Sequence, residues 1–337
     1  MNNLENLLVF SKTLSDLKIK TSLMNKKDLS QELKEKALKE GFAVVGIASI
    51  PGSSRIKLRT KALERWLENN YHSEMKWMES NKRKRIELML NDAKSVITVG
   101  YNYLNENSQN KFLKIAKFGH GEDYHKVIKQ KLSNIGNWLE KKLPNCKWKI
   151  CIDSSPLLEK AWAEESGIGW IGKHSNVINR NHGSWLSLGF IIVNKELTPD
   201  EPAKSLCGKC EKCIEECPTK AITEPFVVNS NLCIAYHTIE NRNTTFPSHI
   251  KQKLNGWVAG CDICQDVCPW NVKFSEMTLE KDFFDEHSIK EKDYNYWENL
   301  TEENYRKLFK NSAVKRAKYS GFKRNVLTAK EQKNNND

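Results

Sequence analysis

Four cysteines stand close together in the stretch CGKCEKCIEECPTK, at residues 207–220. Gaps of two, two and three residues separate them, and a proline follows the last one. Short gaps of this kind let three thiolates wrap one iron–sulfur cubane, while the fourth points away toward a second cluster. The spacing therefore predicts that Cys207, Cys210 and Cys213 bind one [4Fe–4S] cluster and that Cys217 binds another.

Two further stretches supply the four thiols that this pattern still requires. GCDICQDVCPWN (260–271) contains three of them, again with a proline after the last, and NLCIAYHTIE (231–240) contains one. Eight thiols are the number that two [4Fe–4S] clusters need. With the crossover of the fourth cysteine, the predicted ligands are Cys207, Cys210, Cys213 and Cys268 for cluster 1, and Cys217, Cys233, Cys261 and Cys264 for cluster 2.

A pair of zinc sites with four cysteines each is the alternative for these residues. Zinc sites favour separated C-x₂-C pairs, whereas three thiols within seven residues and two C-P pairs favour cubanes. Disulfides are not expected, because the chain lacks a secretory signal and a membrane-length apolar run and is expected in the cytoplasm, where thiols stay reduced. Cys146 and Cys151 fall outside both sets and are expected to be buried in the core.

The rest of the chain has to position these thiols and supply a substrate site. Its 337 residues, 39% of them hydrophobic, are enough for two or three domains. The net charge is +12, and residues 301–337 contribute ten Lys or Arg against four Asp or Glu, a difference of six. This charge favours a polyanionic partner such as nucleic acid, although a solvated basic surface explains it equally well.

Hydrophobic periodicity predicts an α+β fold, with helices and strands mixed through about residue 195. A small domain rich in cysteine and proline follows over 200–275, held by metal rather than by a large core. The helices are expected over 30–41, 62–78 and 123–143, from Ser155 to Gly167, and on both sides of a break at Gly321; the strands are expected over 43–47, 93–103, 148–153 and 187–193.

The stretch CIDSSPLLEKAWAEESGIGWIGKHSN (151–176) is the richest candidate for a substrate site. Asp153 ends a predicted strand beside a helix start, so it is a candidate acid or base, with a helix cap as the alternative. Gly169 and Gly172 predict a loop that a large ligand can approach closely. The chain has neither a G-x-G-x-x-G fingerprint nor a P-loop.

A D-x-H pattern in EDYHKVI is similar to the cobalamin-binding D-x-H-x-x-G, but Ile128 stands where the glycine is required. Asp123 is better explained as a helix cap. We therefore do not expect His125 to ligate cobalt.

Taken together, these stretches resemble the epoxyqueuosine reductase family, which acts in the last step of queuosine synthesis in bacterial tRNA. The resemblance runs in the family's order through residues 30–275. It is carried by YHSEMKWM, GEDYHKVI, CIDSSPLLEKAWAEESGIGWIGKHS, CGKCEKCIEECPTKAI, LCIAYHTIE and GCDICQDVCPWN.

The resemblance implies a cobalamin-binding domain of reductive-dehalogenase type, a two-cluster ferredoxin-like domain and a short C-terminal segment of helical (HEAT-like) repeats. Cobalamin would be bound base-off without a histidine ligand and reduced through two [4Fe–4S] clusters, with Asp153 as the proton donor. A donor must carry its proton, so burial is expected to raise the pKa of Asp153. The further implied cobalamin contacts are Lys117, Val177, Gln265 and Asp266.

The implied partners are tRNA that carries epoxyqueuosine and an external low-potential electron donor, with no membrane, and we expect a monomer. Two features depart from the family: Glu122 stands where many relatives have a basic residue, and the C-terminal region has room for about one helix pair. The residues implied to contact tRNA phosphates are Lys315, Arg316, Lys318, Lys323 and Arg324.

The expected organisation is an N-terminal extension (1–23), the cobalamin-binding catalytic domain (24–199), the ferredoxin-like domain (200–275), the helical segment (276–329) and a disordered tail (330–337). Two alternatives to the tRNA enzyme remain open at this point. One is a cobalamin-dependent reductase of a small molecule, and the other is an electron-transfer module that docks on another enzyme. A zinc-bound RNA-binding protein would be the outcome if the thiols held zinc.

Overall fold

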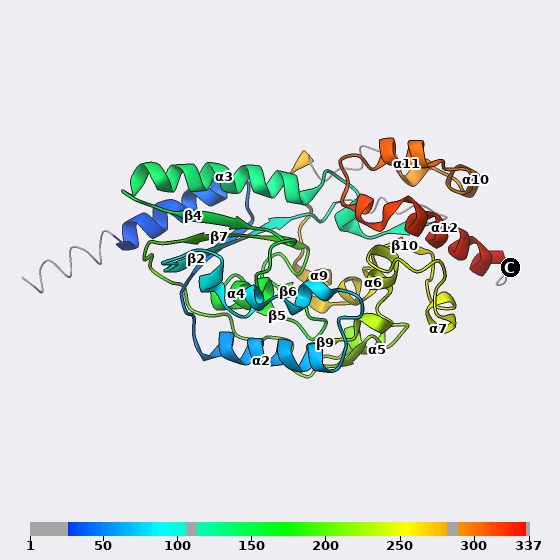
Figure 1. The fold of residues 1–337 in the computed structure, drawn as a ribbon, viewed down its shortest axis with the longest axis horizontal. Coiled ribbons are helices and arrows are strands. Elements are labelled where there is room, and N and C mark those ends of the chain that lie inside the picture. The colour runs from blue at the N-terminus through cyan, green and yellow to red at the C-terminus, as the bar shows by residue number, and fades with distance from the viewer. Residues whose placement is uncertain (1–25, 106–112, 282–288, 335–337) are drawn as a thin grey trace, which may run out of the picture.

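The computed structural model describes residues 26–105, 113–281 and 289–334, so the predicted extension over 1–23 lies outside the described residues. Within them, a four-stranded sheet with the order β1-β2-β7-β4 forms the centre of the larger domain, and every neighbouring pair is antiparallel (Figure 1). Its strands are β1 (Val44–Ser49), β2 (Ser95–Asn102), β7 (Leu186–Val193) and β4 (Trp148–Cys151).

Helices cover both faces of this sheet. Alternate residues of β2 face opposite ways: Ile97 and Val99 pack against a helix over 26–39 and α3 (Tyr124–Lys142), whereas Val96 packs against α4 (Glu159–Glu165). In Figure 1, α3 lies on one side of the sheet, and α4 and α2 (Ser54–Glu68) lie on the other. Burial on both faces explains why β7 is apolar at nearly every position and why β2 is buried at all but its last position.

Three helix boundaries differ from those that the sequence predicts. The helix expected over 62–78 begins at Ser54 and ends at Glu68, because Asn70 adopts a left-handed conformation with a φ of 55°. The helix expected from Ser155 begins at Glu159 instead. Gly321 lies inside α12 (Lys318–Asn334) rather than between two helices, since one glycine costs a helix only about 1 kcal/mol. Helix α12 also includes residues 330–334 of the expected tail.

The cysteine-bearing region consists of short elements. Its strand β10 (Trp257–Ala259) pairs in parallel with β3 (Lys114–Ile115), which precedes α3, so the region is joined to the larger domain through backbone hydrogen bonds. The other elements are α5 (Lys212–Glu215), β8 (Ile222–Glu224), β9 (Val227–Val228), α6 (Ile234–Ile239), α7 (Ser248–Lys251), α8 (Ile263–Asp266) and α9 (Pro269–Phe274). Two further pieces, β5 (Trp170–Ile171) and β6 (Val177–Ile178), form a hairpin beside the sheet.

The C-terminal helices pack on the β3–β10 pair around a core of aromatic rings. These helices are α10 (Tyr294–Glu298), α11 (Glu302–Leu308) and α12. Trp297, Tyr305, Phe309 and Phe322 lie with ring centroids 5.1–6.5 Å apart in the contacting pairs. No helix of the described ranges has the length and the apolar character that crossing a membrane requires.

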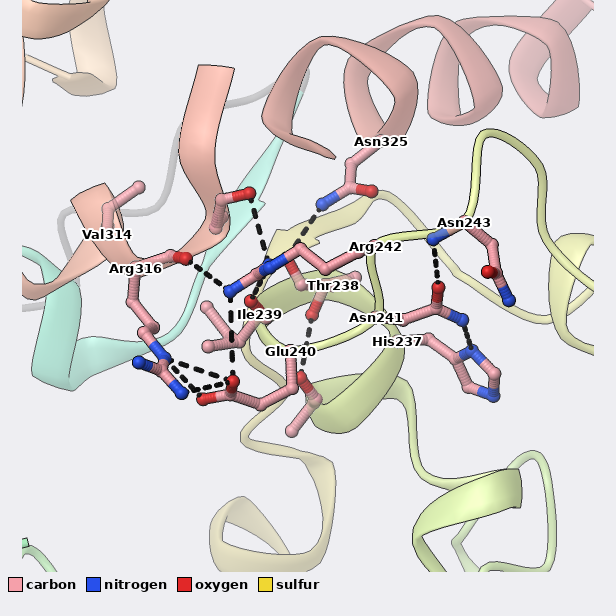
Figure 2. A network of polar contacts seen from close by, with 12 residues as sticks. His237, Thr238, Ile239, Glu240, Asn241, Arg242, Asn243, Val314, Arg316 and Asn325 are labelled. Atoms are coloured by element: carbon pink, nitrogen blue, oxygen red, sulfur yellow. Dashed lines mark hydrogen bonds and ion pairs between the residues drawn. The ribbon is translucent and has the colours of Figure 1, made fainter. Parts of the chain in front are cut away.

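Buried hydrogen bonds fix α12 to the cysteine-bearing region (Figure 2). The side-chain amide of Asn325, fully buried, donates to the backbone oxygens of Thr238 and Val258. Nearby, Arg242 donates to the backbone oxygen of Arg316, whose guanidinium pairs with Glu240 at 2.8 Å. The segment that carries the predicted tRNA contacts is therefore held against the loop after α6.

Arg324 belongs to the same buried contact, and this corrects its prediction as a phosphate contact. Its side chain is buried, and its guanidinium donates to the backbone oxygens of His237, Asn241 and Asn243. It also lies 4.2 Å from the centroid of the Phe246 ring. A guanidinium in this position cannot reach a polyanion on the surface.

We expect Arg324→Met to lower the free energy of unfolding by about 3 kcal/mol, because it leaves several buried carbonyl groups without a donor. Urea unfolding of the variant beside the wild-type protein measures this change. Lys318→Met, on the exposed start of α12, is the control and should change stability by less than about 0.5 kcal/mol. Unchanged stability of the Arg324 variant together with weaker tRNA binding would restore the phosphate role.

Candidate active site

Asp153 lies two residues beyond the end of β4, at the edge of the sheet. Its φ of 40° places it in the left-handed region, which aspartate adopts more readily than most residues. The side chain is 60% exposed, and its Oδ2 atom accepts a hydrogen bond of 3.0 Å from Nε2 of His125. The acid predicted from the sequence is therefore present at a strand end, and its partner comes from the first turn of α3.

A chain of charged groups continues behind His125. Its Nδ1 atom donates to Oδ1 of Asp123 at 2.7 Å, and Oδ2 of Asp123 accepts from Nζ of Lys315 at 2.6 Å. Asp123 is also the N-cap of α3, as predicted, because its side chain accepts from the backbone N–H of His125. The order Lys315–Asp123–His125–Asp153 thus links the C-terminal segment to the candidate acid.

The electrostatics of this chain differ from the expectation of a protonated Asp153. Protein atoms around the carboxylate displace part of its water and act to raise the pKa of Asp153, but the hydrogen bond and the charge of His125, with smaller contributions from Tyr124 and Arg316, hold the pKa below its ordinary value. Burial acts to lower the pKa of His125, but Asp123 and Asp153 outweigh it and raise the pKa to about 9. The proton of the pair therefore rests on His125.

Glu159, at the start of α4, is a second acidic group of the site that the sequence analysis did not single out. Burial and the negative charge of Asp153 raise its pKa to about 8. Its Oε1 atom is buried without a hydrogen-bond partner among the described residues. In the sequence, only its position shortly after Asp153 could have indicated that Glu159 belongs to the site.

The eight predicted cluster ligands lie in two groups. Burial raises the pKa of Cys213 to about 11, and the nearby thiols of Cys268, Cys207 and Cys210 add to the rise. Burial also raises the pKa of Cys264, with contributions from Cys261, Cys233 and Cys217. The thiols that act on Cys213 and on Cys264 are thus members of the predicted set of each, and four soft sulfur donors are the chemistry that a [4Fe–4S] cluster requires.

The two cysteines outside these sets are buried, as predicted. Cys146 packs against the side of the sheet that faces α3, and Cys151 packs against the side that faces α4. Burial is the main cause that raises the pKa of each thiol.

Gln265 and Asn271 fix the second cysteine stretch to the larger domain through Ser184. The Ser184 hydroxyl donates to Oε1 of Gln265 at 2.8 Å, and its backbone N–H donates to Oδ1 of Asn271 at 2.6 Å. The Asn271 amide returns hydrogen bonds to the Ser184 hydroxyl and to the backbone oxygen of Gln265. All three residues are buried, so the side chain predicted for cobalamin contact makes a contact between the two regions.

The remaining residues predicted for cobalamin contact, Lys117, Val177 and Asp266, do not line the cavity beside the second group of thiols. Lys117 pairs with Asp266 at 2.6 Å and lies 4.4 Å from the centroid of the Trp185 ring, so these two predicted residues contact each other. Val177 is buried in the sheet core and pairs with Ile171 across the β5–β6 hairpin.

Gly169 and Gly172 lie against β6 of this hairpin, whereas we predicted that they allow a large ligand to approach the loop. A β-carbon on Gly169 would lie 2.4 Å from the backbone oxygen of Ile178, and one on Gly172 would lie 2.5 Å from the Ile178 side chain. The close approach of β6 therefore requires glycine at 169, whereas at 172 the end of the Ile178 side chain can move aside.

A cavity of about 500 Å³ lies beside the second group of thiols. Its wall is mostly apolar, with Lys160 and Asn176 among the polar side chains. His174, which is 4% exposed, accepts a hydrogen bond at Nδ1 from the backbone N–H of Asn176. Its Nε2 atom has no partner among the described residues. A spacious apolar cavity with an unused donor fits a large cofactor beside cluster 2.

The four other predicted tRNA contacts are distributed unevenly over the surface. Lys315 and Arg316 are about half exposed although both make ion pairs, and Lys318 is exposed. Lys323 is half-buried and donates to the backbone oxygen of Glu298. Arg316 also lies 5.1 Å from the ring centroid of Trp77, which is itself exposed.

Comparison with protein families finds two matching models in this chain. A 4Fe-4S double cluster binding domain matches residues 206–271, and an epoxyqueuosine reductase domain (QueG, DUF1730) matches residues 83–154. The first range contains the eight thiols, and the second contains Asp123, His125 and Asp153.

Curated relatives and solved structures agree with these models. An epoxyqueuosine reductase of Prochlorococcus marinus is 52% identical over 309 residues, which cover 90% of this chain and 98% of the relative. One of Cellulophaga algicola is 42% identical, covering 90% and 99%.

A crystal structure of epoxyqueuosine reductase with a modified tRNA stem loop has the same fold, with a TM-score of 0.81 and 24% identity over 90% of this chain and 81% of that one. The structure of the Streptococcus thermophilus enzyme has a TM-score of 0.78 and 26% identity over 89% and 80%. At the identity and coverage of the curated relatives, the chain belongs to the epoxyqueuosine reductase family of oxidoreductases.

Proposed function

We propose that this protein reduces epoxyqueuosine to queuosine at position 34 of the tRNA anticodon. The observation that carries the proposal is the placement of Asp153 near a cavity lined by four cysteine thiols. Lys160 lines that cavity and interacts with Asp153 as well as with the thiols of Cys264 and Cys233. The candidate acid and the proposed site for an electron carrier therefore both interact with Lys160.

Two [4Fe–4S] clusters and base-off cobalamin are the cofactors of this proposal. When bound, the clusters deliver electrons one at a time from an external low-potential donor, and cobalamin supplies a strongly nucleophilic cobalt centre. We assign cluster 1 to the set that contains Cys213 and cluster 2 to the set that contains Cys264. The thiols of Cys217 and Cys268 then cross between the two halves of the domain.

The chain's own residues bind and orient these groups. Lys117, Asp266 and the backbone of Val177 would contact the corrinoid, while Gln265 would hold cysteine stretch 260–271 in position beside it. No histidine ligand to cobalt is required by this arrangement. Asp153 would donate a proton to the oxygen of the epoxide, and the oxygen would leave as water.

The basic C-terminal segment would bind tRNA phosphates through Lys315, Arg316 and Lys318, with Lys323 at its edge. A related enzyme has been solved with an epoxyqueuosine-modified stem loop, which supports this partner. We interpret α10, α11 and α12 as the start of a HEAT-like array.

We retain the predicted organisation for the rest of the chain. It consists of a cobalamin-binding catalytic domain of reductive-dehalogenase type over 24–199, a ferredoxin-like domain over 200–275 and the helical segment from 276.

Reconstituted protein supplied with cobalamin and a low-potential reductant should convert epoxyqueuosine in tRNA to queuosine. Asp153→Asn should slow this conversion by about 10²–10⁴-fold, the usual contribution of a positioned acid, with little change in tRNA affinity. Nucleoside analysis of the tRNA by mass spectrometry measures the conversion. Epoxyqueuosine that persists unchanged with the wild-type protein would contradict the proposed function.

Cys217→Ala should remove cluster 2 and leave cluster 1 largely intact, so the iron content should fall by about half. Iron analysis together with the electron paramagnetic resonance spectrum of the reduced protein distinguishes the two clusters. Cys151→Ala, which changes a buried thiol outside both sets, is the matched control and should keep the full iron content. Equal loss of both clusters in the Cys217 variant would contradict the pairing.

A further inference from the structure

The proposed reaction requires more protons than Asp153 alone can supply. Converting an epoxide to an alkene breaks two carbon–oxygen bonds, forms a double bond and releases water, which consumes two electrons and two protons. The electrons come from the external donor of the proposed function. One carboxyl group holds one proton, so a second source must lie within reach.

We propose that His125 supplies both protons through Asp153, and that Asp123 and Lys315 hold His125 in the position this requires. This inference rests on the proposed function. It gives His125 the role of proton source for Asp153, which remains the acid that contacts the substrate. His125 acts through Asp153, so it is a positioning and proton-supplying residue that need not touch the substrate.

The geometry assigns a proton to each ring nitrogen of His125. Nδ1 lies 2.7 Å from Oδ1 of Asp123, and Nε2 lies 3.0 Å from Oδ2 of Asp153. Both partners are carboxylate oxygens, which only accept hydrogen bonds when ionised. Both nitrogens must therefore donate, and the imidazolium form satisfies both contacts at once.

The charges around this imidazolium stabilise it unequally. Asp123 is 9% exposed, and Lys315 compensates part of its charge at 2.6 Å. Asp153 is 60% exposed, and it also interacts with Tyr124, Arg316 and Glu159. The pKa of His125, raised to about 9, agrees with a proton that is retained at neutral pH and lost above pH 9.

The proton can be transferred when substrate covers Asp153. Substrate that covers the exposed side of Asp153 removes its water, and burial then favours a neutral acid beside a neutral imidazole over an ion pair. The proton moves from Nε2 to Asp153, and from there to the substrate oxygen. The side chain of His125 is 35% exposed, so it takes a new proton from solvent and passes it along the same route to the departing hydroxyl group.

The structure also connects this proton route to the C-terminal segment. Lys315 follows Ser312, whose hydroxyl donates to the backbone oxygen of Gly119, and the backbone N–H of Asp123 donates to the oxygen of Asn311. The loop before α3 is thus held by the segment that is proposed to bind tRNA. A change at Lys315 should therefore affect the proton route as well as tRNA affinity.

Single-turnover conversion by the reconstituted holoenzyme tests the proposal in His125→Ala and His125→Gln. Each variant should be slower than wild type by about 10- to 100-fold at pH 7.5, with unchanged tRNA affinity and cluster absorbance. Added imidazole should restore the rate of His125→Ala, because the space is open to solvent, and the restored rate should follow the fraction of imidazolium. The wild-type rate should fall as the pH rises through about 9, and this decrease should be absent from both variants without imidazole.

His249→Ala, which removes an exposed histidine on α7, is the matched control and should keep the wild-type rate. A His125→Gln variant with the wild-type rate and pH profile would overturn the proposal, since glutamine can fill the position but carries no titratable proton. A slow His125→Ala variant that imidazole does not restore would overturn it as well. Either result with an active wild-type protein leaves the proposed function standing, whereas an inactive wild-type protein contradicts the function itself.

Discussion

The buried contact between Ser184, Gln265 and Asn271 fixes the position of the cysteine-bearing region on the larger domain. Its hydrogen bonds leave no room for a shifted arrangement, because a displaced partner would leave buried amide and hydroxyl groups without hydrogen bonds. The contact lies on the chain that leads into β7 and on the stretch that carries Cys264 and Cys268. The contact therefore joins the central sheet to the cysteine stretch of the proposed electron path.

The candidate acid, Asp153, is oriented by a different kind of contact. Asp153 extends from the sheet edge toward solvent, and the chain of charges through His125 and Asp123 orients it, together with Tyr124 and Arg316. The outer contact of this chain, between His125 and Asp153, can rearrange at little cost when the surroundings change, because solvent reaches both side chains. The cysteine region is thus held rigidly, whereas the contact between His125 and Asp153 can change. This combination suits a reaction in which a large substrate must enter and leave.

The parts of this site that could be predicted from the sequence are those set by local chemistry. Cysteine spacing predicts the two groups of thiols, since short gaps allow few ligand arrangements, and a strand end beside a helix start predicts Asp153 as a candidate acid. The burial that we expected for Asp153 is not observed, because its side chain is 60% exposed. Contacts between distant segments could not be predicted. The D-x-H pattern indicates a helix cap, but nothing near it in sequence indicates that His125 meets Asp153. Arg324 and Gln265 were assigned to ligands from the family resemblance, whereas both are buried in contacts with residues far away in the chain.

The central claim is that Asp153, with His125 behind it, delivers the proton to the reacting oxygen. The most direct test is a structure of the protein with both clusters, cobalamin and an epoxyqueuosine-modified stem loop bound. We predict that a carboxylate oxygen of Asp153 lies about 3 Å from the epoxide oxygen, with Nε2 of His125 still within hydrogen-bonding distance of Asp153. An epoxide oxygen held by another side chain, with Asp153 turned away from the base, would contradict the account.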